Sequence, residues 1–322
     1  MRTSMRKFLA ICVAFILLLG CAPSGNELTE GPMPITVSIR PHAWLVREIG
    51  GPHVDVQTLV SPGDSPHSYQ PSDAQISRLM ASRAFFRCGV PFERGPWFEA
   101  LQSAGSVRIV DLREGIELRE MESSVPHGQT HAEQDHSEPG DRHAAGSAAH
   151  DHNHDHGHLH AGLDPHIWLS PRLLKHQAQT VASVLQGLDP ENAEPYRRNL
   201  DALVAELNRA DARIRELLGA YQGRSFLVFH PAWGYFADEY GLRQVAIEIQ
   251  GKEPSDREMT ELQQFARDEQ IRVVFVQPQI EGASARAVAE AIGGRVEVLD
   301  PLAEDVSAEL VRAAEAIAQV YR

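Results

Sequence analysis

Residues 196–217, YRRNLDALVAELNRADARIREL, decide how the rest of the chain is organised. Apolar residues recur there at alternating four- and three-residue steps, from Tyr196 through Leu207 to Leu217, with arginine and aspartate between them. This spacing predicts one long amphipathic helix with a single buried face. At about 1.5 Å per residue the helix would be roughly 30 Å long, which suits a stiff connector between two halves. The alternative is a core helix of a single domain.

Short β-branched runs alternate with helical patterns on both sides of this helix. Before it, strands are expected at 35–39, 54–60, 84–88 and 107–110, with helices at 43–50, 73–82 and 94–104. After it, strands are expected at 225–229, 244–249, 271–276 and 295–299, with helices at 232–240, 256–269, 283–292 and from about 303 onwards. Such alternation is typical of βαβ units and parallel sheets.

The fold class that follows is α/β, with two lobes that each hold a mainly parallel sheet flanked by helices. We expect an N-terminal lobe at 35–188, a rigid linking helix within 189–222 and a C-terminal lobe at 223–322. Helix starts are marked by the capping boxes Ser72-x-x-Gln75 and Ser255-x-x-Glu258. Ser170-Pro171 places a capping serine before a proline in the first turn.

Residues 1–20 have the composition of an export signal. Three basic residues precede an apolar run at 8–19 that is too short to span a bilayer. The run ends in Leu-Leu-Gly-Cys at 18–21, which resembles a bacterial lipoprotein signal and implies cleavage before Cys21 and acylation of its thiol. An ordinary secretory signal is the alternative. Residues 21–34 are expected to be a flexible tether, so the protein would be exported and lipid-anchored at the cell envelope.

Composition narrows the class of partner. The 322 residues are 43% hydrophobic, enough for a large core, and carry a formal net charge of −14. This charge argues against nucleic acid as a partner and favours a cation. Once Cys12 leaves with the signal and Cys21 is acylated, Cys88 has no partner in the chain, so neither a disulfide framework nor a thiolate metal cluster is expected.

Ten of the 16 histidines lie between His127 and His160. Gly, Ala, Ser, Asp, Glu and His dominate residues 120–162, so we expect a disordered loop inserted in the first lobe, with its ends held close by the sheet. The loop is interpreted as a low-affinity zinc collector or as a solvated spacer. Its candidate auxiliary ligands are His150, His152, His154, His156, His158 and His160.

Three further histidines lie where predicted strands end or a predicted helix begins. His67 follows the strand that ends near Val60, His166 precedes a capped helix, and His230 follows the strand at 225–229. Asp300 follows the strand at 295–299, and a proline adjoins each of these four residues. Ligands of open α/β sheets bind at the carboxyl ends of strands. Three imidazoles and one carboxylate, without a thiolate, form a set that suits zinc.

Several segments together resemble one known family. They are the lipobox, SPGDSPH at 61–67, DPHIWLSP at 164–171, FHPAWGYF at 229–236, the long helix, the His-rich loop and LDPL at 299–302. They resemble the metal-binding solute receptors of ABC transporters, in particular the zinc-uptake (ZnuA-type) lipoproteins. The resemblance implies a monomeric, non-catalytic clamp that holds Zn²⁺ between its lobes and delivers it to an ABC permease and its ATPase.

The resemblance also implies the ligands, namely His67, His166 and His230. Manganese-type relatives have a carboxylate where His230 stands, so His230 favours zinc. Asp300 is the expected fourth ligand, with Glu248 or water as the substitute. Trp168 and Trp233 are expected to pack the walls of the cleft, and His42, His53 and His176 are not expected to bind the transported metal.

Three other functions remain open at this point. The first is a Mn²⁺ or Fe²⁺ receptor of the same family. The second is a zinc-dependent hydrolase, because three histidines and a water also describe catalytic zinc; however, the sequence has no H-E-x-x-H and no glutamate next to the three histidines. The third is a surface adhesin or a metal buffer unrelated to transport.

Overall fold

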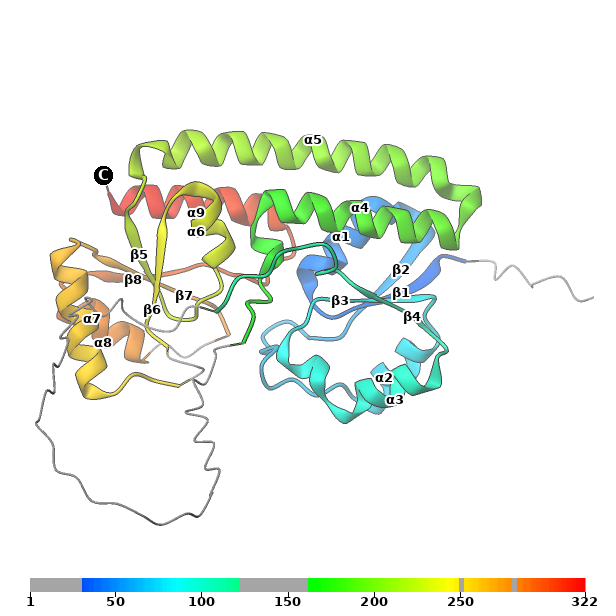
Figure 1. The fold of residues 1–322 in the computed structure, drawn as a ribbon, viewed down its shortest axis with the longest axis horizontal. Coiled ribbons are helices and arrows are strands. Elements are labelled where there is room, and N and C mark those ends of the chain that lie inside the picture. The colour runs from blue at the N-terminus through cyan, green and yellow to red at the C-terminus, as the bar shows by residue number, and fades with distance from the viewer. Residues whose placement is uncertain (1–30, 122–161, 249–251, 280–282, 322) are drawn as a thin grey trace, which may run out of the picture. The chain divides into compact units, whose positions relative to one another are not determined.

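The computed structural model describes residues 31–121, 162–248, 252–279 and 283–321. These residues contain two four-stranded sheets in which all neighbouring strands are parallel (Figure 1). The first has the order β2-β1-β3-β4, with β1 (Met33–Val37), β2 (Val54–Thr58), β3 (Ala84–Arg87) and β4 (Arg108–Asp111). The second has the order β6-β5-β7-β8, with β5 (Ser225–Val228), β6 (Arg243–Ala246), β7 (Val273–Val276) and β8 (Arg295–Val298). The predicted α/β class with two parallel sheets is confirmed.

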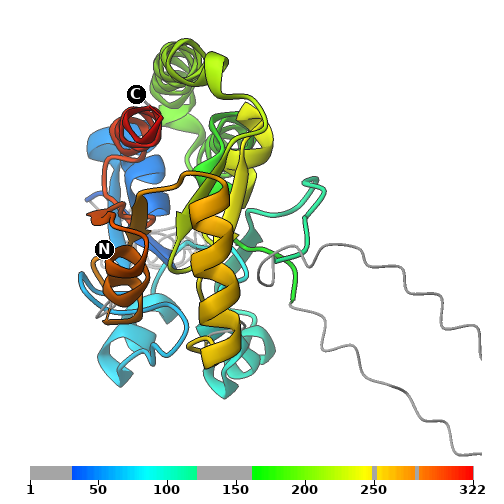
Figure 2. The same ribbon diagram turned by 90° about the vertical axis from the view of Figure 1, so that its left-hand side faces the viewer.

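Helices cover both faces of each sheet. They are α1 (Arg40–Gly50), α2 (Asp73–Met80), α3 (Pro96–Ala104), α4 (Pro171–Leu188), α5 (Ala193–Leu218), α6 (Gly234–Tyr240), α7 (Asp256–Asp268), α8 (Ala283–Ala291) and α9 (Val306–Val320). Single 3-10 turns lie at Gly51–His53, Pro91–Arg94, Ile167–Leu169, Pro190–Asn192 and Gly219–Tyr221. In Figures 1 and 2, α5 runs along the top of both sheets, while α2 and α3 cover the opposite side of the first sheet and α7 and α8 that of the second.

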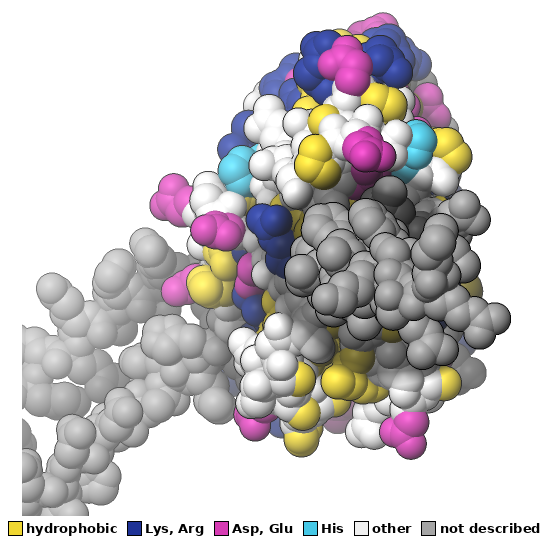
Figure 3. Space-filling view, turned by 90° about the vertical axis from the view of Figure 1, so that its right-hand side faces the viewer, with side chains coloured by type: hydrophobic (Ala, Val, Ile, Leu, Met, Phe, Trp, Pro, Cys, Tyr) yellow, Lys and Arg dark blue, Asp and Glu magenta, His cyan; other side chains and the backbone are white. Residues whose placement is uncertain are grey.

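The long predicted helix is α5, which has 26 residues. Its buried residues are Tyr196, Leu203, Leu207, Ala210, Ile214 and Leu218. Most belong to the predicted stripe, but Leu200 and Leu217 of that stripe are only partly buried, and Leu218 is buried although it was not expected to be. Each leucine buried in this way stabilises the fold by about 1.5–3 kcal/mol. Ion pairs one turn apart, such as Arg213 with Glu216 at 2.8 Å, occupy the solvent side. Basic and acidic side chains accordingly lie beside each other at the top of the molecule in Figure 3.

The packing of α5 explains why it serves as a stiff connector. It packs against α4 and α1 in the first half and against α9 in the second. One continuous apolar cluster therefore extends from the first sheet through these helices to Phe226 and Phe275 of the second sheet. A smaller cluster fills the space between the second sheet and helices α7 and α8. Because interiors are close-packed, a connection of this kind resists bending.

The predicted helix caps are present, while some boundaries differ from expectation. Ser72 and Ser255 form the two capping boxes, and Ser170 accepts a hydrogen bond from the Leu173 amide. The first strand begins two residues earlier than expected, because Met33 and the following proline already pair with β2. The last helix begins at Val306 rather than 303, because Asp305 is its cap and accepts from the Ala308 amide.

Two groups of predictions fall on residues outside the described ranges. They are the signal with Cys21, and the auxiliary histidines between 150 and 160. Glu120 and Leu163, which flank the second of these segments, pair in an antiparallel bridge, and the Met121 amide donates to Gly162 O at 3.1 Å. The two ends therefore lie close together, as predicted, but they pair with each other outside the two four-stranded sheets. In the part of the chain that is described, no helix has the length and apolarity needed to cross a bilayer.

His42 is a core residue of α1. Its ring is fully buried, Nε2 lies 2.9 Å from Gln177 Oε1, and the ring packs edge-on against Trp168. Burial lowers the pKa of His42 to about 4, and the hydrogen bond with Gln177 only partly opposes this shift. The imidazole is therefore neutral in the folded protein at any pH above 5.

This lowered pKa predicts a pH dependence of folding stability. Between pH 6.5 and 4 the unfolded chain binds a proton at His42 that the folded protein does not, so stability falls as the pH falls through this window. At pH 5 the loss from this one group is on the order of 2 kcal/mol. Urea unfolding of the metal-free protein should thus show a steeper pH dependence than that of His42→Gln. Identical slopes for the two proteins would contradict the assignment.

Candidate metal centre

The three proposed histidine ligands come from three separate loops and meet in one cavity. His67 lies between β2 and α2, His166 comes directly before the turn at Ile167–Leu169, and His230 follows β5. The cavity has a volume of about 20 Å³, which is room for roughly one water-sized species. Its lining comprises Pro66, His67, Val90, Pro91, Pro165, His166, Trp168, His230, Gln277, Gln279, Pro301 and Leu302.

The histidine rings lie in contact with each other. The ring centroids of His67 and His230 are 4.7 Å apart, and those of His166 and His230 are 5.2 Å apart. Nε2 of His67 is 3.2 Å from Nε2 of His230. Two nitrogens that share a tetrahedral zinc at about 2.0–2.1 Å would be about 3.3–3.4 Å apart. The spacing of this pair therefore fits a shared ion.

The three rings do not yet form a complete set of metal ligands. Within the described ranges, no three or more His, Cys, Asp or Glu side chains are already arranged as a complete metal-binding group. The pair of His67 and His230 is therefore spaced for an ion, while the complete set of three ligands is not preformed.

Two buried carboxylates orient two of the rings. Asp164 Oδ1 lies 2.7 Å from His166 Nδ1 and also accepts from the His166 amide at 2.9 Å. Glu248 Oε1 lies 3.0 Å from His230 Nδ1. Because a carboxylate is an acceptor, Nδ1 carries the proton in each ring, and the lone pair of Nε2 is left for a metal.

Burial keeps the rings of His67 and His166 uncharged. It lowers the pKa of His67 to about 4, and the neighbouring imidazoles of His230 and His166 act in the same direction. Burial also lowers the pKa of His166, although the carboxylate of Asp164 opposes it. Neutral imidazole is the form that binds metals. These two ligands therefore need to lose no proton when an ion arrives at neutral pH.

Asp300 lies beside the cavity with its carboxylate turned to other partners. Oδ2 forms an ion pair with Arg40 at 3.1 Å, and Oδ1 accepts from Gln279 Nε2 at 3.2 Å and from the Leu302 amide at 3.0 Å. Its neighbours in sequence line the cavity, but Asp300 does not. Trp168 forms part of the wall, and its indole donates to the backbone oxygen of Pro301 at 2.7 Å.

Sequence reasoning did not single out three polar residues of the site. Asp164 stands two positions before His166, and this short spacing is a signal that could have been used. Gln277 and Gln279 follow β7, the strand beside β5, so the rule that ligands gather at carboxyl ends of strands also applied to them. Glu248 was considered only as a fourth ligand, whereas its carboxylate is directed to His230 Nδ1.

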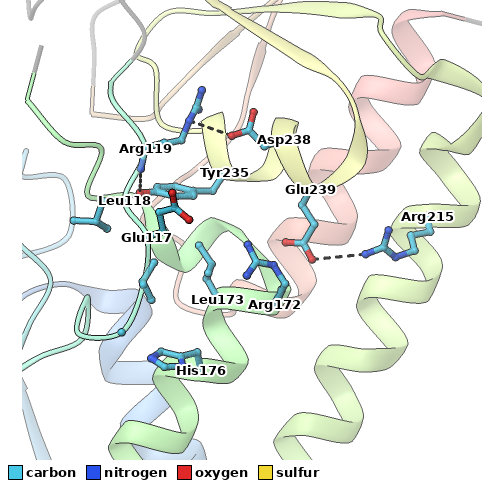
Figure 4. A pocket seen from close by; sticks show the side chains of 12 residues that line it. Glu117, Leu118, Arg119, Arg172, Leu173, His176, Arg215, Tyr235, Asp238 and Glu239 are labelled. Atoms are coloured by element: carbon cyan, nitrogen blue, oxygen red, sulfur yellow. Dashed lines mark hydrogen bonds and ion pairs between the residues drawn. The ribbon is translucent and has the colours of Figure 1, made fainter.

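Tyr235 and Arg119 contact Asp164 and help to fix its position. The Tyr235 hydroxyl donates to the backbone oxygen of Asp164 at 2.9 Å and accepts from the Arg119 amide at 3.1 Å. The Arg119 guanidinium lies 3.8 Å from Asp164 Oδ2 and 3.2 Å from Asp238 Oδ2. Figure 4 shows Arg119, Tyr235 and Asp238 at the wall of a larger open cavity of about 910 Å³.

Gly234 is the residue that makes room for this arrangement. A Cβ atom added there would lie 1.3 Å from Arg119 Nη1 and 3.1 Å from Asp164 Oδ2. A side chain at position 234 would therefore displace the guanidinium. Because Gly234 begins α6, four residues after His230, this contact links the segment that carries His230 to the carboxylate that orients His166.

Comparisons with known proteins show which family the chain belongs to. The family model "Zinc-uptake complex component A periplasmic" matches residues 35–318. The high-affinity zinc uptake system protein ZnuA of Bacillus subtilis strain 168 is 28% identical over 302 residues, which cover 91% of this chain and 86% of the relative.

Solved structures lead to the same family. A crystal structure of ZnuA is 36% identical, with a TM-score of 0.75, over 90% of this chain and 100% of the other. A ZnuA deletion mutant with zinc bound is also 36% identical, with a TM-score of 0.74, over 90% of this chain and 98% of the other. The two-lobed α/β fold, with its paired parallel sheets, is the fold of these proteins. The chain belongs to the ZnuA family of periplasmic zinc-uptake components.

Proposed function

We propose that this protein captures Zn²⁺ outside the cytoplasmic membrane and delivers it to an ABC permease and its ATPase. The observation that carries the proposal is the meeting of His67, His166 and His230 in a cavity with room for about one water-sized species. The relatives named as zinc-uptake components, and the related structure with zinc bound, support the same cargo.

The donor set favours zinc over harder ions. Imidazole nitrogens suit zinc, whereas carboxylate and carbonyl oxygens suit manganese. The nearby carboxylates of Asp164, Glu248 and Asp300 are directed to His166, His230 and Arg40. Cys88 is fully buried and its thiol pKa is raised by burial, so it supplies no thiolate. We therefore propose three neutral imidazoles, with an open fourth position, as the ligand set. Asp300, the fourth ligand expected from the sequence, is paired with Arg40 instead.

The same features favour a receptor over an enzyme. Hydrolysis at a three-histidine zinc requires a general base and space for a substrate beside the metal. Here the carboxylates of Asp164 and Glu248 already accept from ligand histidines. A cavity of about 20 Å³ is far smaller than the several hundred Å³ typical of sites for organic ligands.

The proposal extends to segments outside the described ranges. Export directed by residues 1–20 and acylation of Cys21 would tether the protein, as a monomer, at the cell envelope. His150, His152, His154, His156, His158 and His160 would bind zinc weakly and raise its local concentration. Mass spectrometry of the membrane-bound protein tests the anchor directly, because an acylated N-terminal Cys21 has a characteristic mass.

Removal of one ligand should abolish tight binding. His67→Ala, His166→Ala and His230→Ala should each weaken Zn²⁺ binding by about 100-fold or more, because loss of a partner outside the ligand shell already costs 10–100-fold. Competitive titration against a chelator measures the dissociation constants. His176→Ala is the matched control, since that ring lies on α4 and bonds to Glu114 O instead. Equal loss in the control would contradict the ligand assignment.

Deletion of residues 127–160 separates the weak sites from the tight one. It should lower the number of zinc ions bound at saturation while the tight dissociation constant stays within about twofold, because the proposed ligands lie elsewhere. Isothermal titration of both proteins gives stoichiometry and affinity together. Disappearance of the tight site in the deleted protein would show that the ligands have been assigned wrongly.

The glycine contact gives a third prediction. Gly234→Ala should displace the Arg119 guanidinium from Asp164 and weaken zinc binding by about 10-fold. Arg119→Met, which removes the guanidinium without crowding, should have a similar effect. Gly219→Ala is the control, because a Cβ at Gly219 meets nothing within 4 Å and its φ is −56°. Unchanged affinity in both test variants, with melting temperatures also unchanged, would exclude this role.

A further inference from the structure

Arg40 and Asp300 form an ion pair between the two halves at the edge of the metal cavity. Arg40 begins α1 in the first half, and Asp300 follows β8 in the second. Arg40 Nη2 lies 3.1 Å from Asp300 Oδ2, and the two side chains are only 24% and 21% exposed. Partial burial of both charges makes this pair stronger than a freely solvated one.

The backbone around Asp300 is fixed on both sides. The Asp300 amide donates to Glu309 Oε1 at 2.8 Å, and the backbone oxygen of Pro301 accepts from the Trp168 indole. Trp168 in turn packs against His166, with ring centroids 5.2 Å apart. The loop that carries Asp300 is thus held against the cavity, while the carboxylate itself is bonded to Arg40, Gln279 and the Leu302 amide.

The other carboxylate oxygen is also occupied by residues of the cavity. Oδ1 accepts from Gln279 and from the Leu302 amide, both of which belong to residues that line the cavity. Oδ1 of Asp300 is therefore hydrogen-bonded to residues that line the metal cavity, while Oδ2 is paired with Arg40. If the Arg40 guanidinium were removed, Oδ2 of Asp300 would lose its ion-pair partner.

We propose that Arg40 is a specificity-determining residue, which keeps the Asp300 carboxylate out of the coordination shell of the captured ion. This inference rests on the proposed three-histidine site. A guanidinium remains charged at every physiological pH, so Arg40 is available to pair with the carboxylate throughout that range. The fourth position then remains open to water. Either set can bind zinc, but an added anionic oxygen raises the affinity for harder ions such as manganese relative to zinc.

The ion pair also bears on release. A carboxylate in contact with a divalent cation adds a strong Coulombic attraction in a cavity shielded from water. Arg40 withholds that attraction, so the ion is held by neutral ligands alone. A receptor that must pass its cargo on benefits from a site without a fixed anion, because dissociation then requires no separation of opposite charges.

The test uses the full mature chain and the metals Zn²⁺ and Mn²⁺ alone. Arg40→Met keeps the length of the side chain and removes its charge. It should raise the affinity for Mn²⁺ relative to Zn²⁺ by at least tenfold, measured by competitive titration at one pH. Asp300→Asn should leave Zn²⁺ affinity within about twofold. The double variant Arg40→Met/Asp300→Asn should return the Zn²⁺ to Mn²⁺ ratio to that of the native protein.

Arg47→Met is the matched control. Arg47 lies on the same helix and forms a 3.0 Å pair with Glu304, near Asp300 but more exposed, so its loss should leave the metal ratio unchanged. The inference is overturned if Arg40→Met leaves the ratio unchanged, if the shift persists in the double variant, or if Arg47→Met reproduces it. A tenfold loss of zinc affinity in Asp300→Asn would also overturn it. The proposed function would fail in a different way, because zinc binding would then not depend on His67, His166 and His230.

Discussion

Three imidazole rings can share one small buried cavity only while they are uncharged. In water each ring would take up a proton near pH 6.5, and two imidazolium ions in contact would repel each other strongly. Burial removes this conflict, because it lowers the pKa of His67 and His166 below the ordinary value. The unprotonated cluster is the form that a divalent cation requires. The same desolvation that makes the cluster possible therefore prepares it for a metal.

The frame around the cluster is a consequence of parallel sheets. Parallel strands deliver their carboxyl ends to one edge, and β2 and β5 bring His67 and His230 to facing edges of the two sheets. The shared apolar cluster beneath α5 fixes these edges relative to each other. Asp164 and Glu248 then fix individual rings, so rigidity extends from the core to the ligating nitrogens.

Sequence patterns predicted most of this frame because the signals are local. The stripe from Tyr196 to Leu217, the capping boxes and the alternation of strands and helices each act within a few residues. Errors were confined to element ends, as at Met33, where pairing with β2 extends the strand. The histidines could be found because each lies beside a proline at the end of a strand or the start of a helix.

The electrostatic contacts of the site could not be predicted in the same way. Arg40 and Asp300 are 260 positions apart, and no local pattern pairs an arginine at a helix start with that aspartate. Glu248 and His230 are 18 positions apart, so the choice between a ligand and an orienting group depends on side-chain direction. The contact between Gly234 and Arg119 depends equally on tertiary packing. The polar contacts around the proposed ligands thus join residues that only tertiary packing brings together.

The most direct measurement is X-ray absorption at the zinc edge, on the protein lacking residues 127–160 and loaded with one equivalent of zinc. The account predicts three imidazole nitrogens at about 2.0–2.1 Å, one further light atom and no sulfur. It also predicts that the number of imidazoles falls to two in the same protein carrying His230→Ala. A native spectrum with fewer than three imidazoles, or one that His230→Ala leaves unchanged, would contradict it.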